Sequence, residues 1–155
     1  MKKNKSGFFI LGIILLLIAF FIWNRLTNLD LKDVAAWKSA GLDCINEGVT
    51  TLGQHIHPQV RIYVDGTEEF IPAHIGLIRS CTSEIHTHED MPNIHVESAF
   101  ADKVFKLGEF FVVWDEPIER PGYKVEMTVD GQTSTDLGNL VLKDKQQIVL
   151  KYTKI

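Results

Sequence analysis

The longest apolar stretch lies near the start of the chain, where 16 residues run from Phe8 to Trp23 without a polar side chain. A helix needs ~20 mainly apolar residues to cross the hydrocarbon core of a bilayer, and Trp is common at the edge of that core. The stretch lacks the polar face that a surface helix of a folded domain has. The pattern therefore predicts a cytoplasmic basic stub and a transmembrane signal anchor at residues 1–27, with lipid contact through residues 8–23.

The flanks of this stretch favour a retained anchor over a cleaved signal peptide. No small-x-small cleavage site follows the stretch, and no Cys stands behind it to accept a lipid. Basic residues are enriched on the cytoplasmic side of membrane helices. We therefore expect the N-terminus in the cytoplasm and the remaining domain outside the cell membrane. The lysines before the stretch are Lys2, Lys3 and Lys5, and Arg25 and Lys32 follow it near two aspartates.

Alternation of apolar and polar residues begins further along the chain and predicts two hairpins. Residues 59–64 and 67–71 alternate on either side of Asp65-Gly66, which is a strong signal for a two-residue turn. Residues 84–88 and 93–97 flank a polar, proline-containing turn and predict the second hairpin.

The segments around the hairpins complete the expected elements. Residues 28–53 are interpreted as a stalk, in which Asp33 caps a short helix, and an irregular lead-in. Apolar residues at i, i+3, i+4 and i+7 predict a short helix at 107–113. Further strands are expected at 124–129, 140–142 and 147–152, with an Asp-Gly turn after the first of them.

The order of these elements indicates the fold class. Two hairpins, one short helix and further strands predict an α+β domain at residues 54–155 with a mixed or antiparallel sheet. A helix after a first hairpin, and a closing strand, make the arrangement β-grasp-like by fold analogy, which does not define a function.

Charge changes the picture of partners. The chain carries 16 Lys and Arg against 20 Asp and Glu, a formal net charge of −4. The first 23 residues hold three of the lysines and no acid, so the rest carries 13 basic and 20 acidic groups, a net charge of −7. An acidic domain repels a phosphate backbone, so we expect no nucleic-acid partner.

Two cysteines are too few for a disulfide scaffold. Outside the cytoplasm a pair of cysteines is more often bonded than free. We therefore favour a Cys44–Cys81 disulfide. The alternative is that Cys81 is a thiolate metal ligand, because it lies five residues before His86.

The histidines are the unusual feature, because all six fall between His55 and His95. Two pairs have H-x-H spacing, which puts both rings on the same face of a strand. If His86 pairs with His95 in the second hairpin, the residues sort into an apolar and a polar face, and a slip of one residue would destroy this sorting. The apolar face would hold Ile85, Thr87, Ile94 and Val96, and the polar face Glu84, His86, His88, His95 and Glu97.

Imidazoles at opposed strand positions are close enough to share an ion, since their Cβ atoms lie ~4.5–5.5 Å apart. We therefore expect a transition-metal ion as cofactor, copper or zinc. Two histidines with one carboxylate would instead suit non-haem iron. His74 is expected to be structural or solvent-facing. The candidate ligands are His86, His88 and His95, with His55 and His57 on an adjoining strand or in a second site, and Glu84 and Glu97 beside them.

Several motifs in this region resemble a family of small membrane-anchored bacterial and archaeal proteins. They are HIHPQVRIYVDG, IPAHIG, a Cys before EIHTH, IHVES and LGEFFVVW, and they extend over residues 55–114. The resemblance implies an extracytoplasmic domain that carries the five histidines of these motifs. The chain departs from the family pattern at residues 89–93, where a small loop with Asp and Gly is expected, so the resemblance implies no role for Met91.

These features together predict a membrane-anchored extracytoplasmic protein that binds a transition metal for metal handling or sensing. A membrane protein is a partner that this location would allow. Two alternatives stay open. One is a non-enzymatic interaction or scaffold module of a membrane complex, with structural histidines, and the other is a small metal-dependent oxidoreductase. Motifs for a serine nucleophile are missing from the sequence, so we do not expect a hydrolase.

Overall fold

The computed structural model describes residues 5–46, 48–88 and 92–155, with side chains from residue 11 onward. Lys2, Lys3 and Met91 therefore lie outside the described residues, as does most of the turn of the second hairpin. The described chain is an α+β structure. A long apolar N-terminal helix is followed by three small sheets and one short α-helix.

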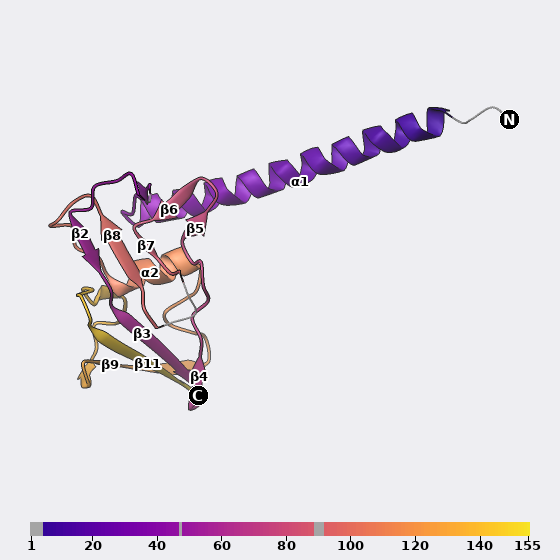
Figure 1. Ribbon diagram of the computed structural model, residues 1–155. Helices are drawn as coiled ribbons and strands as arrows, with labels where there is room; N and C mark the ends of the chain where they lie inside the picture. Colours follow the sequence, from indigo (N-terminus) through magenta and orange to yellow (C-terminus); the bar gives the residue numbers. More distant parts are fainter. Residues whose placement is uncertain (1–4, 47, 89–91) are drawn as a thin grey trace.

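Helix α1 (Lys5–Ser39) projects from the rest of the molecule as a long rod (Figure 1). Its 35 residues extend for about 52 Å at 1.5 Å per residue. Leu11–Ser39 is long and apolar enough to cross a membrane, by length and composition, a test that a signal sequence also passes. The prediction of a separate short helix capped by Asp33 is wrong. Asp33 lies inside α1, because no Gly or Pro interrupts the chain between Trp23 and Ser39.

The end of α1 is part of the packed core. Trp37 is 4% exposed, and Leu42, just beyond the helix, is 1% exposed. The chain then enters β1 (Cys44–Ile45), so the expectation that this lead-in is irregular is wrong in part. β1 forms the edge of a three-stranded antiparallel sheet in the order β1-β6-β5, with β6 (Cys81–Ser83) and β5 (Leu77–Ile78).

A disulfide joins Cys44 in β1 to Cys81 in β6, with their Cα atoms 5.2 Å apart. Such a cross-link typically stabilises a fold by ~2–4 kcal/mol, chiefly by restricting the unfolded chain. A bonded sulfur offers no thiolate, so this structure does not support Cys81 as a metal ligand. The N-terminal apolar helix and the disulfide together suggest an extracytoplasmic location.

A five-stranded mixed sheet forms the far end of the molecule from α1 (Figure 1). The central strand, β11, is parallel to its neighbour β3, with Ile148 beside Val60, and the other pairs are antiparallel. Both expected Asp-Gly turns are present, and Asp65 and Asp130 have positive φ values of 49° and 50°, as tight hairpin turns require. The strand order is β10 (Gln132–Ser134), β9 (Tyr123–Val129), β11 (Gln147–Lys154), β3 (Gln59–Val64) and β4 (Thr67–Glu69).

Helix α2 (Leu107–Trp114) confirms the expected short helix and fills the core between the sheets. Its buried side chains include Phe110 and Phe111, and burying a side chain of this size stabilises a fold by about 1.5–3 kcal/mol. The short 3₁₀ helix η1 (Leu137–Asn139) packs beside α2. The strand expected at 140–142 is wrong, since Val141 makes only an isolated bridge with Lys106.

The third sheet is antiparallel and lies between α1 and the five-stranded sheet (Figure 1). It has the order β2 (Gln54–Ile56), β8 (His95–Ser98) and β7 (Ile85–His86). The register of the second hairpin is confirmed, since β7 and β8 pair His86 with His95 and the preceding residue with Val96. The residues expected on its apolar face are all buried: Ile85, Thr87, Ile94 and Val96.

Candidate metal centre

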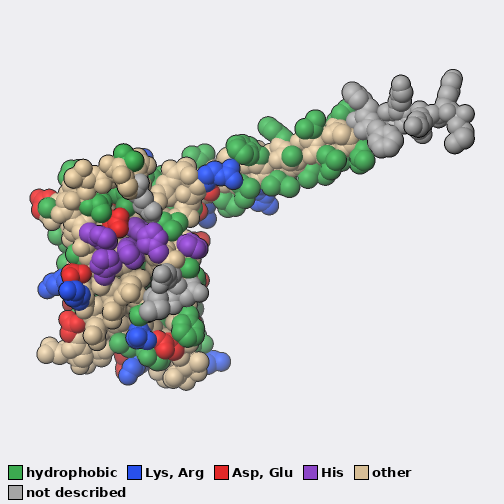
Figure 2. Space-filling view, viewed as in Figure 1, with side chains coloured by type: hydrophobic (Ala, Val, Ile, Leu, Met, Phe, Trp, Pro, Cys, Tyr) green, Lys and Arg blue, Asp and Glu red, His purple; other side chains and the backbone are tan. Residues whose placement is uncertain are grey.

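Histidines and carboxylates share one face of the β2-β8-β7 sheet. β8 is the central strand, so its side chains have neighbours on both flanking strands. Figure 2 shows the histidine side chains gathered into one patch on this face of the molecule. The register of β2 and β8, continued one residue past the end of β2, puts His57 beside His95. The first row is then His57, His95 and His86, and the second is His55, Glu97 and Glu84.

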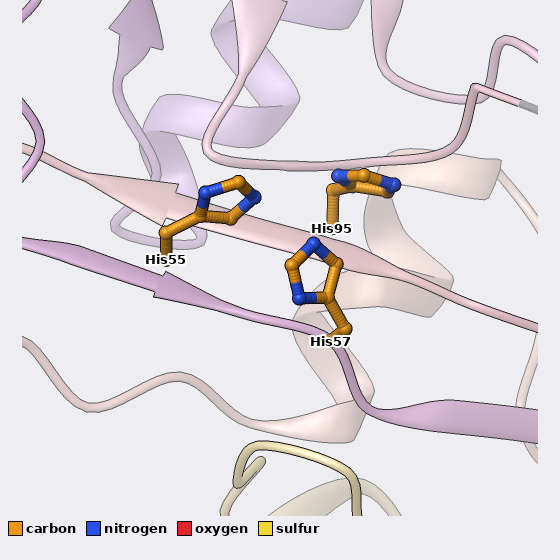
Figure 3. Close-up of side chains that lie close together, drawn as sticks. All are labelled: His55, His57 and His95. Carbon is orange, nitrogen blue, oxygen red and sulfur yellow. The ribbon is translucent and has the colours of Figure 1, made fainter.

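The first triad consists of His55, His57 and His95, and one ring nitrogen from each lies within 4.8 Å of the others. The ring centroids of His55 and His57 are 4.4 Å apart, and those of His57 and His95 are 4.7 Å apart. The three rings project from β2 and β8 into a common space (Figure 3). The side chains of His55 and His57 are 43% and 41% exposed, so solvent reaches this triad.

The second triad consists of His86, His88 and His95 and meets the same distance limit. It is the more buried of the two, because His86 is fully buried. The Nδ1 atom of His86 lies 2.9 Å from the carbonyl oxygen of Ser83, which can only accept a hydrogen bond. That contact assigns the hydrogen to Nδ1, so the lone pair on Nε2 accepts a hydrogen bond of 3.0 Å from Nε2 of His88. A ring held this way by a backbone carbonyl is typical of metal-ligating histidines.

His95 belongs to both triads and lies between the two flanking pairs of rings. Its Nδ1 atom is buried and has no hydrogen-bond partner among the described residues. Burial, together with the charge that the four neighbouring imidazoles carry when protonated, lowers the pKa of His95 to about 4. His95 is therefore neutral at physiological pH, and neutral imidazole is the form that binds metal.

The two carboxylates of this face have different surroundings. Glu97 Oε1 lies 3.1 Å from Nε2 of His55 and 3.9 Å from Nδ1 of His95, so its charge borders the first triad. Glu84 is 2% exposed and forms an ion pair with Lys103. Its oxygens also accept hydrogen bonds from the Ser98 hydroxyl at 2.7 Å and from the Asp43 backbone N–H at 2.9 Å. These contacts hold the Glu84 carboxylate within the fold, and it belongs to neither triad.

A glycine allows the loop at residues 72–76 to lie directly against β7. Gly76 has a φ of +77°, and a Cβ at this position would lie 2.6 Å from the Ile85 carbonyl oxygen and 3.1 Å from the His86 Cβ. The loop is fastened by hydrogen bonds from the His74 N–H to the Thr87 carbonyl and from the Ser83 N–H to the Gly76 carbonyl. This close contact fixes the backbone that positions His86.

The nitrogen positions suit a transition-metal ion. Nitrogen ligands at ~2.0–2.1 Å from a tetrahedral ion are about 3.4 Å from one another. The His86–His88 nitrogen distance of 3.0 Å is already close to this value, and the 4.8 Å limit of both triads leaves the remaining nitrogens within reach of small ring rotations. Imidazole donors suit zinc and copper, among other ions, and do not select one of them by themselves.

The structure brings five of the sequence-predicted residues together in the two triads, and Glu97 beside them. His74 lies in the adjacent loop at a φ of +65° and belongs to neither triad. Sequence reasoning missed the residues that support the site, because their contacts come from other strands and loops. They are Lys103 and Ser98 at Glu84, the Ser83 carbonyl at His86, Asp144 near His57, and Gly76.

No family model, curated protein or solved structure matches this chain. The fold and the site therefore define a class of protein. It is an α+β protein with an apolar N-terminal helix and clustered histidines that could hold a metal ion.

Proposed function

We propose that this protein is a membrane-anchored extracytoplasmic protein that binds copper or zinc through its histidine cluster, for metal handling or sensing. One observation carries the proposal. Five imidazoles from three neighbouring strands and the residues just beyond their ends lie on one face, and their nitrogens group into two triads within 4.8 Å. Nitrogen donors that converge on one point are what a transition metal requires.

The unpaired nitrogen of His95 favours metal binding over purely structural histidines. A histidine kept for packing or hydrogen bonding is expected to have partners for its buried polar atoms, since each unsatisfied group costs about 1–3 kcal/mol. Nδ1 of His95 is buried and has no such partner among the described residues. A bound ion would take up its lone pair and would remove that cost.

The location and orientation complete the proposal. The apolar helix, the basic residues before it and the Cys44–Cys81 disulfide support a single-pass protein with its N-terminus in the cytoplasm and its histidines outside. Arg79 lies 5.3 Å from the centroid of the Trp23 ring. If Trp23 marks the membrane interface, the folded domain lies close to the bilayer surface, where a metal-handling membrane partner could reach it.

The topology of the five-stranded sheet supports a β-grasp arrangement. Two hairpins, β3-β4 and β9-β10, lie on either side of the central strand β11, which is parallel to β3, and α2 lies between the hairpins in sequence. We also propose that the chain belongs with the small membrane-anchored proteins that its IPAHIG, IHTH and IHVES motifs resemble. Neither assignment by itself carries the metal-binding proposal.

Metal titration of the purified full-length chain in detergent tests the proposal. We expect Cu(II) or Zn(II) to bind to the wild type and the His86→Ala/His88→Ala variant to lose the ion held at the second triad. The matched control is His74→Asn, which removes an imidazole outside both triads and keeps a residue that tolerates positive φ. The interaction-module alternative predicts no specific uptake by the wild type, and that result would refute the proposal.

A further inference from the structure

His95 is the feature of the site that the binding proposal alone does not explain. It is a member of both triads, and every ring contact between the two flanking pairs of histidines runs through it among the described residues. Its ring centroid lies 4.7 Å from both His57 and His88, which lie just beyond the ends of the two flanking strands, β2 and β7. The position follows from the fold, because β8 is the central strand of the sheet.

The chemistry of imidazole limits how two triads can share one residue. Each ring nitrogen has one lone pair in the ring plane, so it binds one ion. If both triads hold an ion at the same time, one ion must use Nδ1 of His95 and the other Nε2. Nδ1 lies on the side of Glu97, the residue that also contacts His55. In Figure 3 one nitrogen of His95 is turned toward His55 and the other away from it.

We propose that His95 bridges two metal ions as an imidazolate, so that the two triads form a single dinuclear centre. This inference rests on the proposed metal-binding function. The first triad supplies His55 and His57 to one ion, and the second supplies His86 and His88 to the other. Neutral His95 binds the first ion through its lone pair, and the second ion replaces the remaining N–H proton, which is released to solvent.

Two features of the site suit such a bridge. Ions on opposite ring nitrogens are held about 6 Å apart, given nitrogen–metal distances of ~2.0–2.1 Å, which limits their mutual repulsion. The Glu97 carboxylate borders the first triad and supplies a negative charge there. Nδ1 of His95, the nitrogen nearest that carboxylate, is the buried atom without a hydrogen-bond partner among the described residues.

Copper binding followed by electron paramagnetic resonance at liquid-helium temperature tests the bridge in the full-length chain. We expect one Cu(II) per triad in the wild type and loss of the ordinary mononuclear signal, because a bridging imidazolate couples the two unpaired spins. Replacing one copper with diamagnetic zinc should restore a mononuclear signal. The His55→Ala/His57→Ala variant changes exposed positions, and it should keep one copper with a full, uncoupled signal.

The outcomes separate the two proposals. Two coppers with uncoupled signals of full intensity would overturn the bridge, and so would a wild type that binds a single copper, although each result would leave metal binding intact. No copper in any variant would refute both proposals. Calorimetry in buffers of different ionisation enthalpy gives a second readout, since the second ion should release one more proton than a mononuclear site of the same ligands. The His74→Asn variant should behave as the wild type in both measurements.

Discussion

The five-stranded sheet and the β2-β8-β7 sheet use their buried faces for different purposes. In the larger sheet, inward positions of β3 and β11 are apolar and almost fully buried, as for Ile62 and Leu150. In the smaller sheet, one face is equally apolar, but the opposite face carries histidines and carboxylates, of which His86 and Glu84 are buried whereas His55 is exposed to solvent. The larger sheet is built for stability, whereas the smaller one also holds His95, whose buried Nδ1 has no hydrogen-bond partner among the described residues.

The largest effect is expected from Leu150→Ala in β11. Leu150 is fully buried, and truncating such a residue typically costs 2–5 kcal/mol. We expect the free energy of unfolding to fall by about that amount, while the metal stoichiometry of the folded fraction stays unchanged. Denaturant unfolding followed by circular dichroism measures the first quantity. Lys151→Ala, at an exposed neighbouring position, is the control. A loss of metal binding in folded Leu150→Ala would remove the distinction between the two sheets.

Gly76→Ala should damage both stability and site geometry. The left-handed backbone costs about 1–2 kcal/mol for a residue with a Cβ, and the new Cβ would also press on the β7 backbone beside His86. Gly122→Ala has a similar φ of +80° but meets nothing within 4 Å, so it isolates the backbone cost. We expect metal affinity at the second triad to fall in Gly76→Ala alone. Equal affinities in the two variants would show that the loop does not position His86.

Glu97→Gln tests the carboxylate beside the first triad. The change keeps the size of the side chain and removes the charge 3.1 Å from His55. Mutating such an outer partner of a metal ligand typically lowers affinity 10–100-fold, so we expect a loss of about 10-fold at the first triad, measured by competition with a chelator. The second triad should be affected less. Glu84→Gln is the contrasting variant, because Glu84 is paired with Lys103 and should act mainly on stability.

The smallest effect is expected from pH acting on the metal-free protein. Burial lowers the pKa of His95 to about 4, from 6.5 in an unfolded chain. Between these values the unfolded state binds more protons than the folded state, so stability is greatest above pH 6.5 and falls as the pH approaches 4. The side chain is 25% exposed, and solvent screening makes the effect modest. Denaturation midpoints measured with a chelator present should fall less steeply in His95→Ala, and identical slopes would contradict this.

Local patterns were sufficient to predict the elements that depend on local chemistry. The Asp-Gly turns, the α2 helix and the His86–His95 register follow from turn preferences, helical spacing and the sorting of two faces. The β1 strand could not be found in this way, because its two residues are fixed by pairing with β6. The strand predicted at 140–142 is wrong for the same reason. The residues there are apolar, but no neighbouring strand pairs with them beyond the isolated bridge at Val141.

The site shows the same division. Clustering in the sequence was enough to select the five histidines, and the H-x-H spacing to put each pair on one face. The sequence could not show that β2 lies beside β8, which brings His55 and His57 to His95. Nor could it show that Lys103 would neutralise Glu84, since the ion pair joins residues 19 positions apart through tertiary packing. Long-range contacts of this kind leave no local pattern.

Anomalous X-ray diffraction at the copper and zinc edges, on crystals of the metal-loaded full-length protein, tests the central claim most directly. We expect anomalous peaks between the rings of His86, His88 and His95, and between those of His55, His57 and His95. Peaks elsewhere, or no peaks with the rings hydrogen-bonded to one another and to water, would contradict it.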